Sequence, residues 1–550
     1  MFSLLKVLHR TVAFNHSRRL ASTYTDKPFF LTCPIFYVNS KPHLGHAYTT
    51  CLADSWARYA HLRNQAVLKP FQQDYTASSY SSVFDYCSSN KTFLSCGTDE
   101  HGSKTLCHAT HVKCNDFIRT TETRHSKAVC EFWKRLETSG HLYRSKYSGW
   151  YCISDEAFYM PWEVIETSVS GVPIAKETGN PVEWIEEENY MFKLSFFKND
   201  LHRWLDSGIF SKSSSQSVWG DIAHNIVDTT QDVSISRPKC RLDWGIQVPV
   251  DDKQIIYVWL DALVSYLTVA GFPWSTDDSS KQILWPPDIQ FFGKDIIRFH
   301  AVLWPALLMA VDLPLPRRLI CHHHVLVDDV KMSKSRGNHI DPISEQCALF
   351  AEELNNITPG ESDVLRYVLL RLPLLTSDST YSREMARQMI NTELVNWIGN
   401  LLSRITSESL NPEQSIIQIN RNEVNDMFHH DNLDTDFFNR RVIIFVFNYL
   451  DNISYHFDKL WWYKAQPHNA IEEVLRVVRQ TNAFITRHSP WSEQEPLRRQ
   501  AVISVVAESL RVCALLMYPV VPNLSHRLLN RLGITTKKVN CQVSLMEHEF

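Results

Sequence analysis

The junction spanning residues 32–50 constrains the fold more than any other stretch of this chain. Residues 29–38 are largely apolar and aromatic, as a buried strand is, and residues 39–42 supply turn chemistry. Residues 43–60 have the pattern of a helix, so His43-Leu44-Gly45-His46 falls where a strand runs into a helix N-terminus. The free N–H groups and positive dipole of such a junction bind phosphate groups. The alternative interpretation is that the two histidines only cap a surface helix.

Length and charge narrow the class of protein. A chain of 550 residues exceeds what one core supports, so we expect three or four domains. The net charge of -4 gives no overall basic field, and a nucleic-acid partner therefore has to be argued from local sites. The thirteen cysteines contain no C-x-x-C pair, which argues against a disulfide framework and a zinc knuckle. A reducing compartment is the simpler expectation.

Residues 1–25 have the composition of a mitochondrial transit peptide. They contain four basic side chains and several hydroxyl residues, no acid precedes Asp26, and the apolar residues are interspersed rather than gathered into one run. A disordered cytosolic tail is the alternative. No run of about 18 or more apolar residues appears elsewhere, so no membrane span is predicted.

Residues 27–135 predict the first half of a doubly wound parallel sheet, because strand, turn, helix and strand follow one another. The second strand is expected at 93–96 and leads into Gly97-Thr98-Asp99-Glu100-His101-Gly102. Ligands of such sheets bind beyond the carboxyl ends of the strands, so we interpret this segment as a site rather than an ordinary polar loop. Residues 69–92 are polar without periodicity and are expected to be an inserted surface loop.

The remaining chain completes a multidomain α/β fold. Residues 136–244 have short segments and frequent turns, which predict a small α+β connective domain inserted into the sheet domain. Sheet character returns over 245–322, with buried strands expected at 255–260 and 289–292. Residues 385–550 carry apolar side chains at helical spacing and predict a C-terminal helical bundle. The fold class is therefore a Rossmann-like doubly wound parallel sheet, split by the connective domain and followed by the bundle.

A second motif, Lys331-Met332-Ser333-Lys334-Ser335, lies within residues 323–384. Two lysines separated by small hydroxyl residues suit a mobile loop that closes over phosphates with point charges. A solvated basic loop is the more common meaning of such a run. In the bundle, Asn400 and Arg404 share a helix face and Trp491 follows a proline. Amide, guanidinium and indole groups can read and stack unpaired bases, although each of these three residues can equally be structural.

The two motifs, in this order and far apart, resemble the signatures of class I aminoacyl-tRNA synthetases. Several segments between them narrow the resemblance to the methionyl-tRNA synthetase family, in its mitochondrial form, over residues 29–532. These segments are Gly97-Thr98-Asp99-Glu100-His101-Gly102, Gly149-Trp150-Tyr151-Cys152, Glu188-Asn189-Tyr190, Ser234-Ile235-Ser236-Arg237-Pro238 and Tyr257-Val258-Trp259-Leu260-Asp261-Ala262.

The resemblance implies a two-step reaction. Methionine and ATP give methionyl-adenylate and pyrophosphate, and the methionyl group then passes to the 3' end of mitochondrial tRNA(Met), the initiator included. His43 and His46 would contact the phosphates, and Gly45 would let the adenine stack. Lys334, with Lys331 beside it, would stabilise the departing pyrophosphate together with Mg2+.

The resemblance also implies the binding residues. Arg237 and Asp295 would align the nucleotide and the amino acid, and residues 323–384 would contact the acceptor stem. An aromatic pocket suits the soft sulfur of methionine and disfavours charged or branched side chains. This methionine site would comprise Tyr37, Asp99, Trp259, Ala262, Tyr266, Ile296 and His300. In the bundle, Asn400, Arg404 and Trp491 fall on the anticodon-reading positions.

The chain departs from the family pattern at several places. Many members hold zinc in the connective domain, but Cys152 has Asp155 where a C-x-x-C partner would be and residues 175–181 lack cysteine, so no zinc is expected. Residues 69–92 have no counterpart, and the chain is about two dozen residues shorter than the family near residues 106–117. His323 and Asp329 replace glycines near the second motif.

These departures leave two readings beside an active mitochondrial enzyme that charges tRNA. One is a catalytically impaired homologue or splice variant that binds tRNA or a partner without charging. The other is a sister synthetase for leucine, isoleucine, valine or cysteine, although residues 150–244 look too short for the editing domain of the large aliphatic enzymes. The expected localisation is the mitochondrial matrix, and the expected state is a monomer, because no appended domain follows the bundle.

Overall fold

The computed structural model describes residues 27–37, 42–63, 92–99, 107, 110, 112–153, 157–159, 161–166, 172–176, 179–211, 215–240, 244–274, 284–332, 337–350, 363–412, 450 and 452–534.

Six parallel strands form the sheet at the centre of these residues. β1 and β4 pair with β3 at a common residue, Ser95, so they lie along its two opposite edges. The resulting order, β4-β3-β1-β14-β15, is that of a doubly wound sheet and places the topological switch point between β1 and β14. The strands are β1 (Phe29–Thr32), β2 (Phe36–Tyr37), β3 (Thr92–Asp99), β4 (Asp116–Arg119), β14 (Ile289–Gly293) and β15 (Leu319–His322).

The strand expected at 29–38 is instead two strands, β1 and β2, separated at Pro34. Proline has no N–H to give to a ladder, so a break at this position is unsurprising. β2 resumes pairing along β3, with Tyr37 opposite Asp99. The strand expected at 93–96 is confirmed and extends to Asp99, so Gly97 and Asp99 are sheet residues rather than loop residues.

The strand expected at 255–260 is wrong in its second half and in its sheet. β13 (Asp251–Ile256) ends at Ile256, and helix α8 (Val258–Val269) begins two residues later. β13 pairs antiparallel with β11 (Ser236–Pro238) and β12 (Gln247–Val248), outside the parallel sheet. A buried apolar run such as Val258-Trp259-Leu260 has no period that separates strand from helix. The strand expected at 289–292 is confirmed as β14.

A few hydrogen bonds fix the link between β3 and β4 in place. Asn115 bonds the end of the link to β3. The Asn115 N–H donates to the Leu94 carbonyl at 2.8 Å, and the Asn115 Oδ1 accepts from the Leu94 N–H at 2.9 Å. The Lys113 N–H donates to Asp54 Oδ1 at 2.9 Å, which ties the link to helix α2 (Leu44–Leu62). These bonds set β4 parallel to β3 in register.

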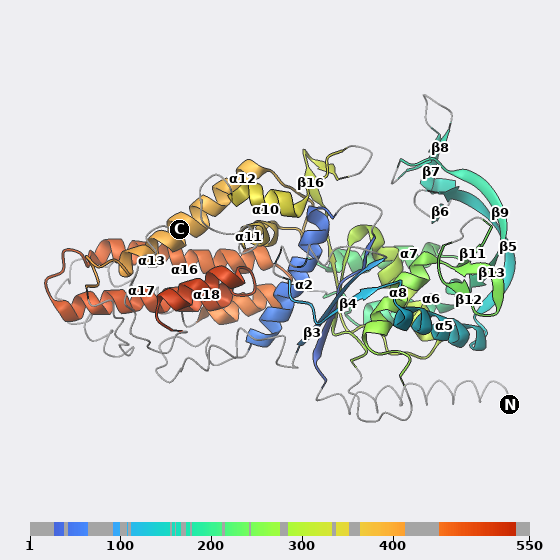
Figure 1. The fold of residues 1–550 in the computed structure, drawn as a ribbon, viewed down its shortest axis with the longest axis horizontal. Coiled ribbons are helices and arrows are strands. Elements are labelled where there is room, and N and C mark those ends of the chain that lie inside the picture. The colour runs from blue at the N-terminus through green and yellow to red at the C-terminus, as the bar shows by residue number, and fades with distance from the viewer. Residues whose placement is uncertain are drawn as a thin grey trace.

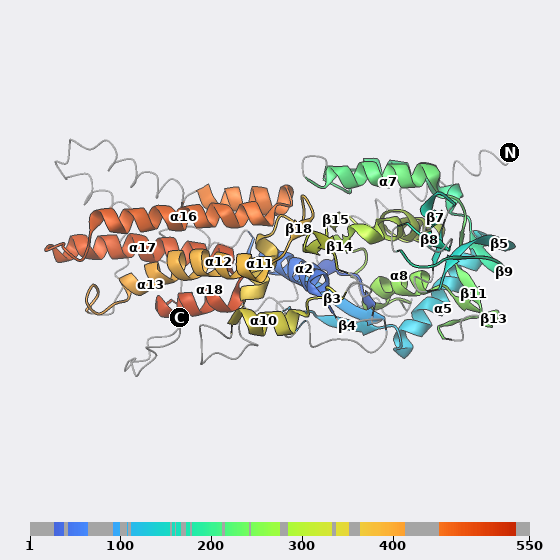
Figure 2. The same ribbon diagram turned by 90° about the horizontal axis from the view of Figure 1, so that it is seen from above.

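The connective domain lies at the far end of the sheet from the helical bundle (Figures 1 and 2). Its main feature is a long antiparallel ribbon of β5 (Leu142–Cys152) and β9 (Glu183–Phe192). Helix α5 (Thr123–Thr138) leads into the ribbon and packs beside α8. The other elements are β6 (Ala157–Tyr159), η2 (Pro161–Glu163), β7 (Val164–Glu166), β8 (Pro173–Ala175), η3 (Leu194–Phe197), α6 (Lys198–Asp206), α7 (Ser217–Thr229) and β10 (Val233–Ser234).

After β14 the chain returns through short helices and a small sheet to the bundle. These elements are η4 (Lys294–Ile296), η5 (Phe299–Leu303), α9 (Trp304–Ala310), β16 (Val325–Val327), β17 (Val330–Lys331), α10 (Pro342–Phe350), α11 (Val364–Arg371), β18 (Ser379–Thr380), α12 (Arg383–Met389), η8 (Ile390–Gly399), α13 (Asn400–Ile405), η9 (Lys459–Tyr463), α16 (Pro467–His488), α17 (Pro496–Met517) and α18 (Pro522–Arg531). β16 pairs with both β17 and β18, so the segment that opens the second motif rests on residues just before the bundle.

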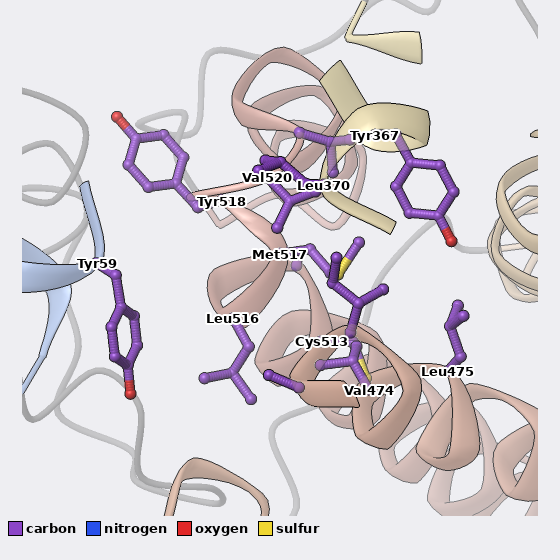
Figure 3. Close-up of a cluster of buried hydrophobic side chains, with 14 of the residues drawn as sticks. Tyr59, Tyr367, Leu370, Val474, Leu475, Cys513, Leu516, Met517, Tyr518 and Val520 are labelled. Carbon is purple, nitrogen blue, oxygen red and sulfur yellow. The ribbon is translucent and has the colours of Figure 1, made fainter. Parts of the chain in front are cut away.

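Helix α2 joins the sheet to the bundle. It stands between them in Figure 1, and one continuous apolar core runs from β1 and β3 through α2 into α11, α16 and α17. Figure 3 shows this contact, with Tyr59 of α2 facing the ends of the bundle helices near Leu516 and Tyr518. Helix α17 is long and apolar enough to cross a membrane by composition, but 89% of its apolar window is buried inside the protein. Burial of that kind is typical of a core helix.

Candidate active site

The two histidines of the first motif cap α2 as a pair. His43 is the N-cap residue, and its Nδ1 accepts a hydrogen bond from the Gly45 N–H at 3.0 Å. His46 Nδ1 accepts from the His43 N–H at 3.1 Å. Since both Nδ1 atoms accept, each neutral ring carries its proton on Nε2 and can donate it outward. Capping and ligand binding are therefore compatible roles for the same two rings.

Both rings are held in the neutral form. Burial, together with the neighbouring His46 and His339 rings, lowers the pKa of His43 to about 2. Burial also lowers the pKa of His46 to about 4, although the Asp295 carboxylate acts in the opposite direction. The His43 and His46 ring centroids lie 4.0 Å apart, and His339 stacks on His43 at 5.4 Å. At physiological pH the pair is a set of neutral N–H donors at a positive helix terminus.

Gly45 is required by the histidine pair itself. A Cβ added to Gly45 would lie 2.8 Å from His43 Cε1 and 3.0 Å from its Nδ1. The His43 ring folds back over the first turn to accept the Gly45 N–H, and this leaves no room for a side chain there. The structure thus adds a reason for the glycine that the sequence pattern alone does not supply.

The second motif begins beside the end of β14. Lys331 ends β17, and its Nζ lies 3.5 Å from Asp295 Oδ2. His324 Nε2 lies 3.6 Å from the other oxygen of the same carboxylate. His322, the last residue of β15, contacts Thr49 Oγ1 of α2 through Nε2 at 2.8 Å. Side chains of α2, η4, β15 and β17 therefore converge at the switch point, whereas Lys334 lies outside the described residues.

An aromatic cluster joins α8 to the segment that follows β14. Trp259, Ala262 and Tyr266 share one face of α8, and Trp259 stacks on Phe299 with ring centroids 3.7 Å apart. The sequence argument did not identify Phe299. Tyr266 is 3% exposed and His300 is 1% exposed, so the hydroxyl and ring that meet here are cut off from water.

The polar atoms of this cluster have one consistent set of donors and acceptors. His300 Nδ1 lies 3.0 Å from the Ile296 carbonyl, to which it donates, so its Nε2 accepts from the Tyr266 hydroxyl at 2.8 Å. Burial lowers the pKa of His300 to about 4 and raises that of Tyr266. The predicted residues Trp259, Tyr266, Ile296 and His300 are thus brought together by hydrogen bonds and ring contacts, with Ala262 on the same helix face.

Asp99 and Tyr37 are neighbours across two strands. They are register partners at the carboxyl ends of β3 and β2, as ligand residues of a parallel sheet would be. Asp99 Oδ1 accepts a hydrogen bond from the Thr120 hydroxyl at 2.8 Å, just beyond β4. The Asp99 carboxylate is therefore positioned by Thr120, the residue that follows β4.

Arg237 lies at the edge of the connective domain. Its guanidinium donates to Ser234 Oγ and to the Ser236 carbonyl, and it lies over the Tyr257 ring at 4.2 Å. The side chain is 4% exposed. Tyr257 is the residue before α8, so its ring connects Arg237 to the start of that helix.

The three predicted anticodon residues are exposed in the bundle. Asn400 and Arg404 point from α13 to solvent, and Trp491, in the connection between α16 and α17, is 57% exposed. Figures 1 and 2 place α13 and this connection toward the end of the bundle that is distant from the sheet. An exposed tryptophan of this kind is available for base stacking.

Apolar side chains fill the stretch of the connective domain where the resemblance places zinc ligands. Cys152 and Ala175 are fully buried and pack with Val182, and three further apolar residues, Trp150, Tyr159 and Val164, surround them. Among the described residues of this domain, no set of metal-binding side chains gathers at Cys152.

Other residues near the site have no sequence signal. His125 of α5 is completely buried between Asp261 Oδ1, at 2.6 Å from its Nε2, and Thr268 Oγ1, at 2.8 Å from its Nδ1. His339, which stacks on His43, follows the second motif after three further residues. Both contacts join elements far apart in the chain, so no local spacing could have indicated them.

The chain matches known proteins over most of its length. The model of the class I tRNA synthetases (M) matches residues 29–406. The mitochondrial methionine–tRNA ligase of Xenopus laevis is 36% identical over 521 residues, which cover 93% of this chain and 87% of the relative. The corresponding human protein is 35% identical, covering 93% and 85%.

Solved structures agree with these relatives. The structure of Mycobacterium tuberculosis methionyl-tRNA synthetase bound by methionyl-adenylate has a TM-score of 0.71 and 30% sequence identity, and the match covers 92% of this chain and 94% of that one. The free form of the same bacterial enzyme has a TM-score of 0.69. The chain belongs to the methionyl-tRNA synthetases, the ATP-dependent methionine–tRNA ligases of class I.

Proposed function

We propose that this chain activates methionine with ATP and transfers it to the 3' end of mitochondrial tRNA(Met), the initiator included. One observation carries the proposal: the neutral Nε2–H donors of His43 and His46 and the Asp295–Lys331 pair converge at the switch point, and the buried Tyr266–His300 pair lies on the segment that follows Asp295. A phosphate site and an apolar amino-acid site next to each other suit the joining of an amino acid to a nucleotide.

The first step needs positioning and charge stabilisation more than covalent help. A methionine carboxylate oxygen attacks the α-phosphorus in line, the bond to the bridging oxygen breaks, and pyrophosphate leaves with the electron pair. His43 and His46 donate N–H bonds to phosphate oxygens, and Lys331 and Lys334 stabilise the charge on the leaving group. Mg2+ enters on the ATP phosphates, as that ion usually does.

The methionine pocket explains how one side chain is selected. Asp99 takes the ammonium group, with Tyr37 opposite it in the sheet. Trp259, Ala262, Tyr266, Ile296 and His300 surround the thioether. Because the Tyr266 hydroxyl and the His300 ring satisfy each other, the wall toward the ligand is polarisable but offers no unpaired charge. A charged side chain would remain unpaired in this pocket, and a β-branched one has the wrong shape.

The nucleotide and tRNA contacts involve residues of α2, η4, β11 and the bundle. Gly45 lets the adenine approach the first turn of α2, Asp295 aligns the nucleotide, and Arg237 does so through Tyr257, on whose ring it lies. In the second step the tRNA ribose hydroxyl attacks the carbonyl carbon of methionyl-adenylate, and AMP leaves. Asn400, Arg404 and Trp491 read the anticodon.

The setting is proposed as the mitochondrial matrix, in line with relatives named as mitochondrial. We propose that the protein is a monomer. Its apolar helix α17 is buried in the core of the bundle, so we propose no membrane span. We also propose that the connective domain folds without zinc, because the cluster around Cys152 already stabilises it by apolar packing.

The test is ATP–pyrophosphate exchange with protein lacking residues 1–25, in the presence of methionine, leucine or cysteine. Exchange with methionine alone is expected. Exchange with leucine or cysteine instead would reassign the amino acid, and a folded sample with no exchange would favour a scaffold that binds tRNA without charging it. Light scattering of the same sample checks the monomer.

A further inference from the structure

Three cysteine thiols meet in the core of the catalytic domain. Cys96 lies within β3, Cys107 lies on the link that follows, and Cys114 lies just before β4. Their Sγ atoms all lie within 4.8 Å of one another. Cys96 is 1% exposed, Cys107 is 5% exposed, and Cys114 is half-buried.

A fourth thiol borders this group. Cys33 directly follows β1 and is 1% exposed, and its N–H donates to the Ser95 carbonyl at 3.1 Å, next to Cys96 in the chain. The Cys33 thiol donates to the Thr49 carbonyl of α2 at 3.9 Å. Three segments, namely the middle of β3, the link and the residues just before β4, therefore each contribute one sulfur to the same place, and the end of β1 brings a fourth cysteine beside them.

Simple core packing does not account for this arrangement. A free cysteine usually behaves as a small apolar residue that packs against carbon. Here the sulfurs lie close to one another. The Asn115–Leu94 bonds place Cys114 beside β3, and the Val112 N–H donates to the Cys107 carbonyl at 2.9 Å. Sulfurs this close suit a shared metal ion or an oxidised pair.

We propose that Cys33, Cys96, Cys107 and Cys114 bind one Zn2+ ion in a closed structural site. Tetrahedral Zn–S bonds of about 2.3 Å place the sulfurs about 3.8 Å apart, so the thiols of Cys96, Cys107 and Cys114 need to contract by no more than about 1 Å. The Cys33 thiol, which donates to the Thr49 carbonyl at 3.9 Å, exchanges that bond for the ion. On binding, each thiol loses its proton, and one Zn2+ with four thiols gives one tetrathiolate complex and four protons released to solvent. Buried sulfurs leave no open position for a substrate, so the site is structural rather than catalytic.

The ion would secure the part of the sheet that holds Asp99. β3 carries Asp99 at its end, and β4 leads to Thr120, whose hydroxyl bonds the Asp99 carboxylate. Joining Cys96 to Cys114 through the ion clamps the start of β4 to β3, in the stretch where the chain is shorter than its family pattern. The site is separate from the connective domain and does not depend on the amino acid that the enzyme charges.

The experiment uses the full chain, expressed with added zinc and purified with reductant and without chelator. Elemental analysis is expected to find about one zinc per chain. Exchange with Co2+ is expected to give the intense sulfur-to-cobalt charge-transfer bands of a tetrathiolate. Displacing the ion with a mercurial is expected to release the zinc and consume four thiols together.

Variants locate the ion. Cys107→Ser and Cys114→Ser are expected to lose most of the zinc, whereas Cys130→Ser, a half-buried cysteine outside the group, keeps it. If the two site variants do not fold, the zinc content and cobalt spectrum of the unmodified chain still decide. Folded protein with far less than one zinc and no cobalt bands would overturn the proposal. So would zinc retained in a folded Cys107→Ser/Cys114→Ser double variant, or a disulfide among these cysteines in protein kept reduced.

Discussion

At the scale of single residues, the position of one proton decides what the first motif can do. Backbone N–H groups occupy Nδ1 of both His43 and His46, so the outward donors are their Nε2–H groups. A charged imidazolium would attract phosphate more strongly, but burial makes it costly here. The motif therefore behaves as part of the helix terminus, an array of neutral donors whose strength varies little with pH.

Gly45→Ala tests the fit of this array. The new Cβ would meet the His43 ring at 2.8 Å, so the ring must leave its place on the Gly45 N–H. We expect ATP–pyrophosphate exchange to fall by at least about tenfold, roughly the worth of one misplaced donor. Gly220→Ala is the matched control, because its Cβ would meet nothing closer than 3.9 Å. Equal exchange in both variants would show that the His43 position does not matter.

His300 gives a prediction on pH and stability. Its pKa falls from 6.5 to about 4 on folding, so below pH 6.5 the unfolded chain takes up a proton that the folded chain refuses. The stabilisation is complete above pH 6.5 and is lost as the pH falls toward 4. Between pH 7 and pH 5 this one group removes about 2 kcal/mol. In His300→Gln, the drop in the free energy of unfolding between these pH values, measured by urea unfolding, is expected to shrink by that amount, and an unchanged drop would refute the assignment.

At the scale of elements, α2 connects the chemistry to the bundle. Its first turn carries the histidine pair, its middle carries the fully buried Asp54, and its last turn meets the bundle core shown in Figure 3. Asp54 Oδ2 lies 2.7 Å from Arg58 Nε and 2.5 Å from Arg366 Nη2. Arg366 also donates to the Pro519 carbonyl at the end of α17. One carboxylate thus joins α2, α11 and the bundle.

Asp54→Ala is expected to destabilise the protein strongly, because two buried guanidinium groups lose their counter-charge. Breaking a buried ion pair by removing one partner costs about 3–5 kcal/mol. Glu131→Ala, which breaks the Arg135 pair on the surface of α5, is the control and is expected to cost about 1 kcal/mol or less. Urea unfolding measures both. Similar losses in the two variants would mean that the Asp54 network does not stabilise the junction.

At the scale of the whole molecule, the start of α2 and the connection between α16 and α17 lie at opposite ends of one α2-to-bundle path (Figure 1). On the proposed assignment, the first reaction step uses only the sheet domain, whereas charging also uses the far end of the bundle. We therefore expect the two activities to be separable by mutation.

Trp491→Ala is expected to leave ATP–pyrophosphate exchange nearly intact while lowering the rate of tRNA charging by about tenfold or more, since stacking one base is worth about 1–3 kcal/mol. Trp244→Ala removes a similarly exposed tryptophan, 62% against 57%, from the opposite half of the molecule. It serves as the control and should preserve both activities. A parallel fall of exchange and charging in Trp491→Ala would contradict an anticodon role.

The sequence alone determined the chemistry that is local along the chain. The histidine motif at a helix start, the parallel sheet, the helical bundle and the family follow from spacing and residue type, because caps, periods and motifs involve neighbours in sequence. The same reasoning misplaced the strand at 255–260, since a fully buried apolar run has no periodicity.

Tertiary structure alone decided the features made by convergence. Several features depend on atoms that the fold brings together. They are the tautomers of His43 and His46, the Tyr266–His300 pair, the His339 ring over His43 and the Asp54 network. The clustered thiols of Cys96, Cys107 and Cys114 show this most clearly. They lie far from any C-x-x-C spacing, so the absence of that motif argued against zinc, whereas folding of β3, β4 and their link sets them side by side.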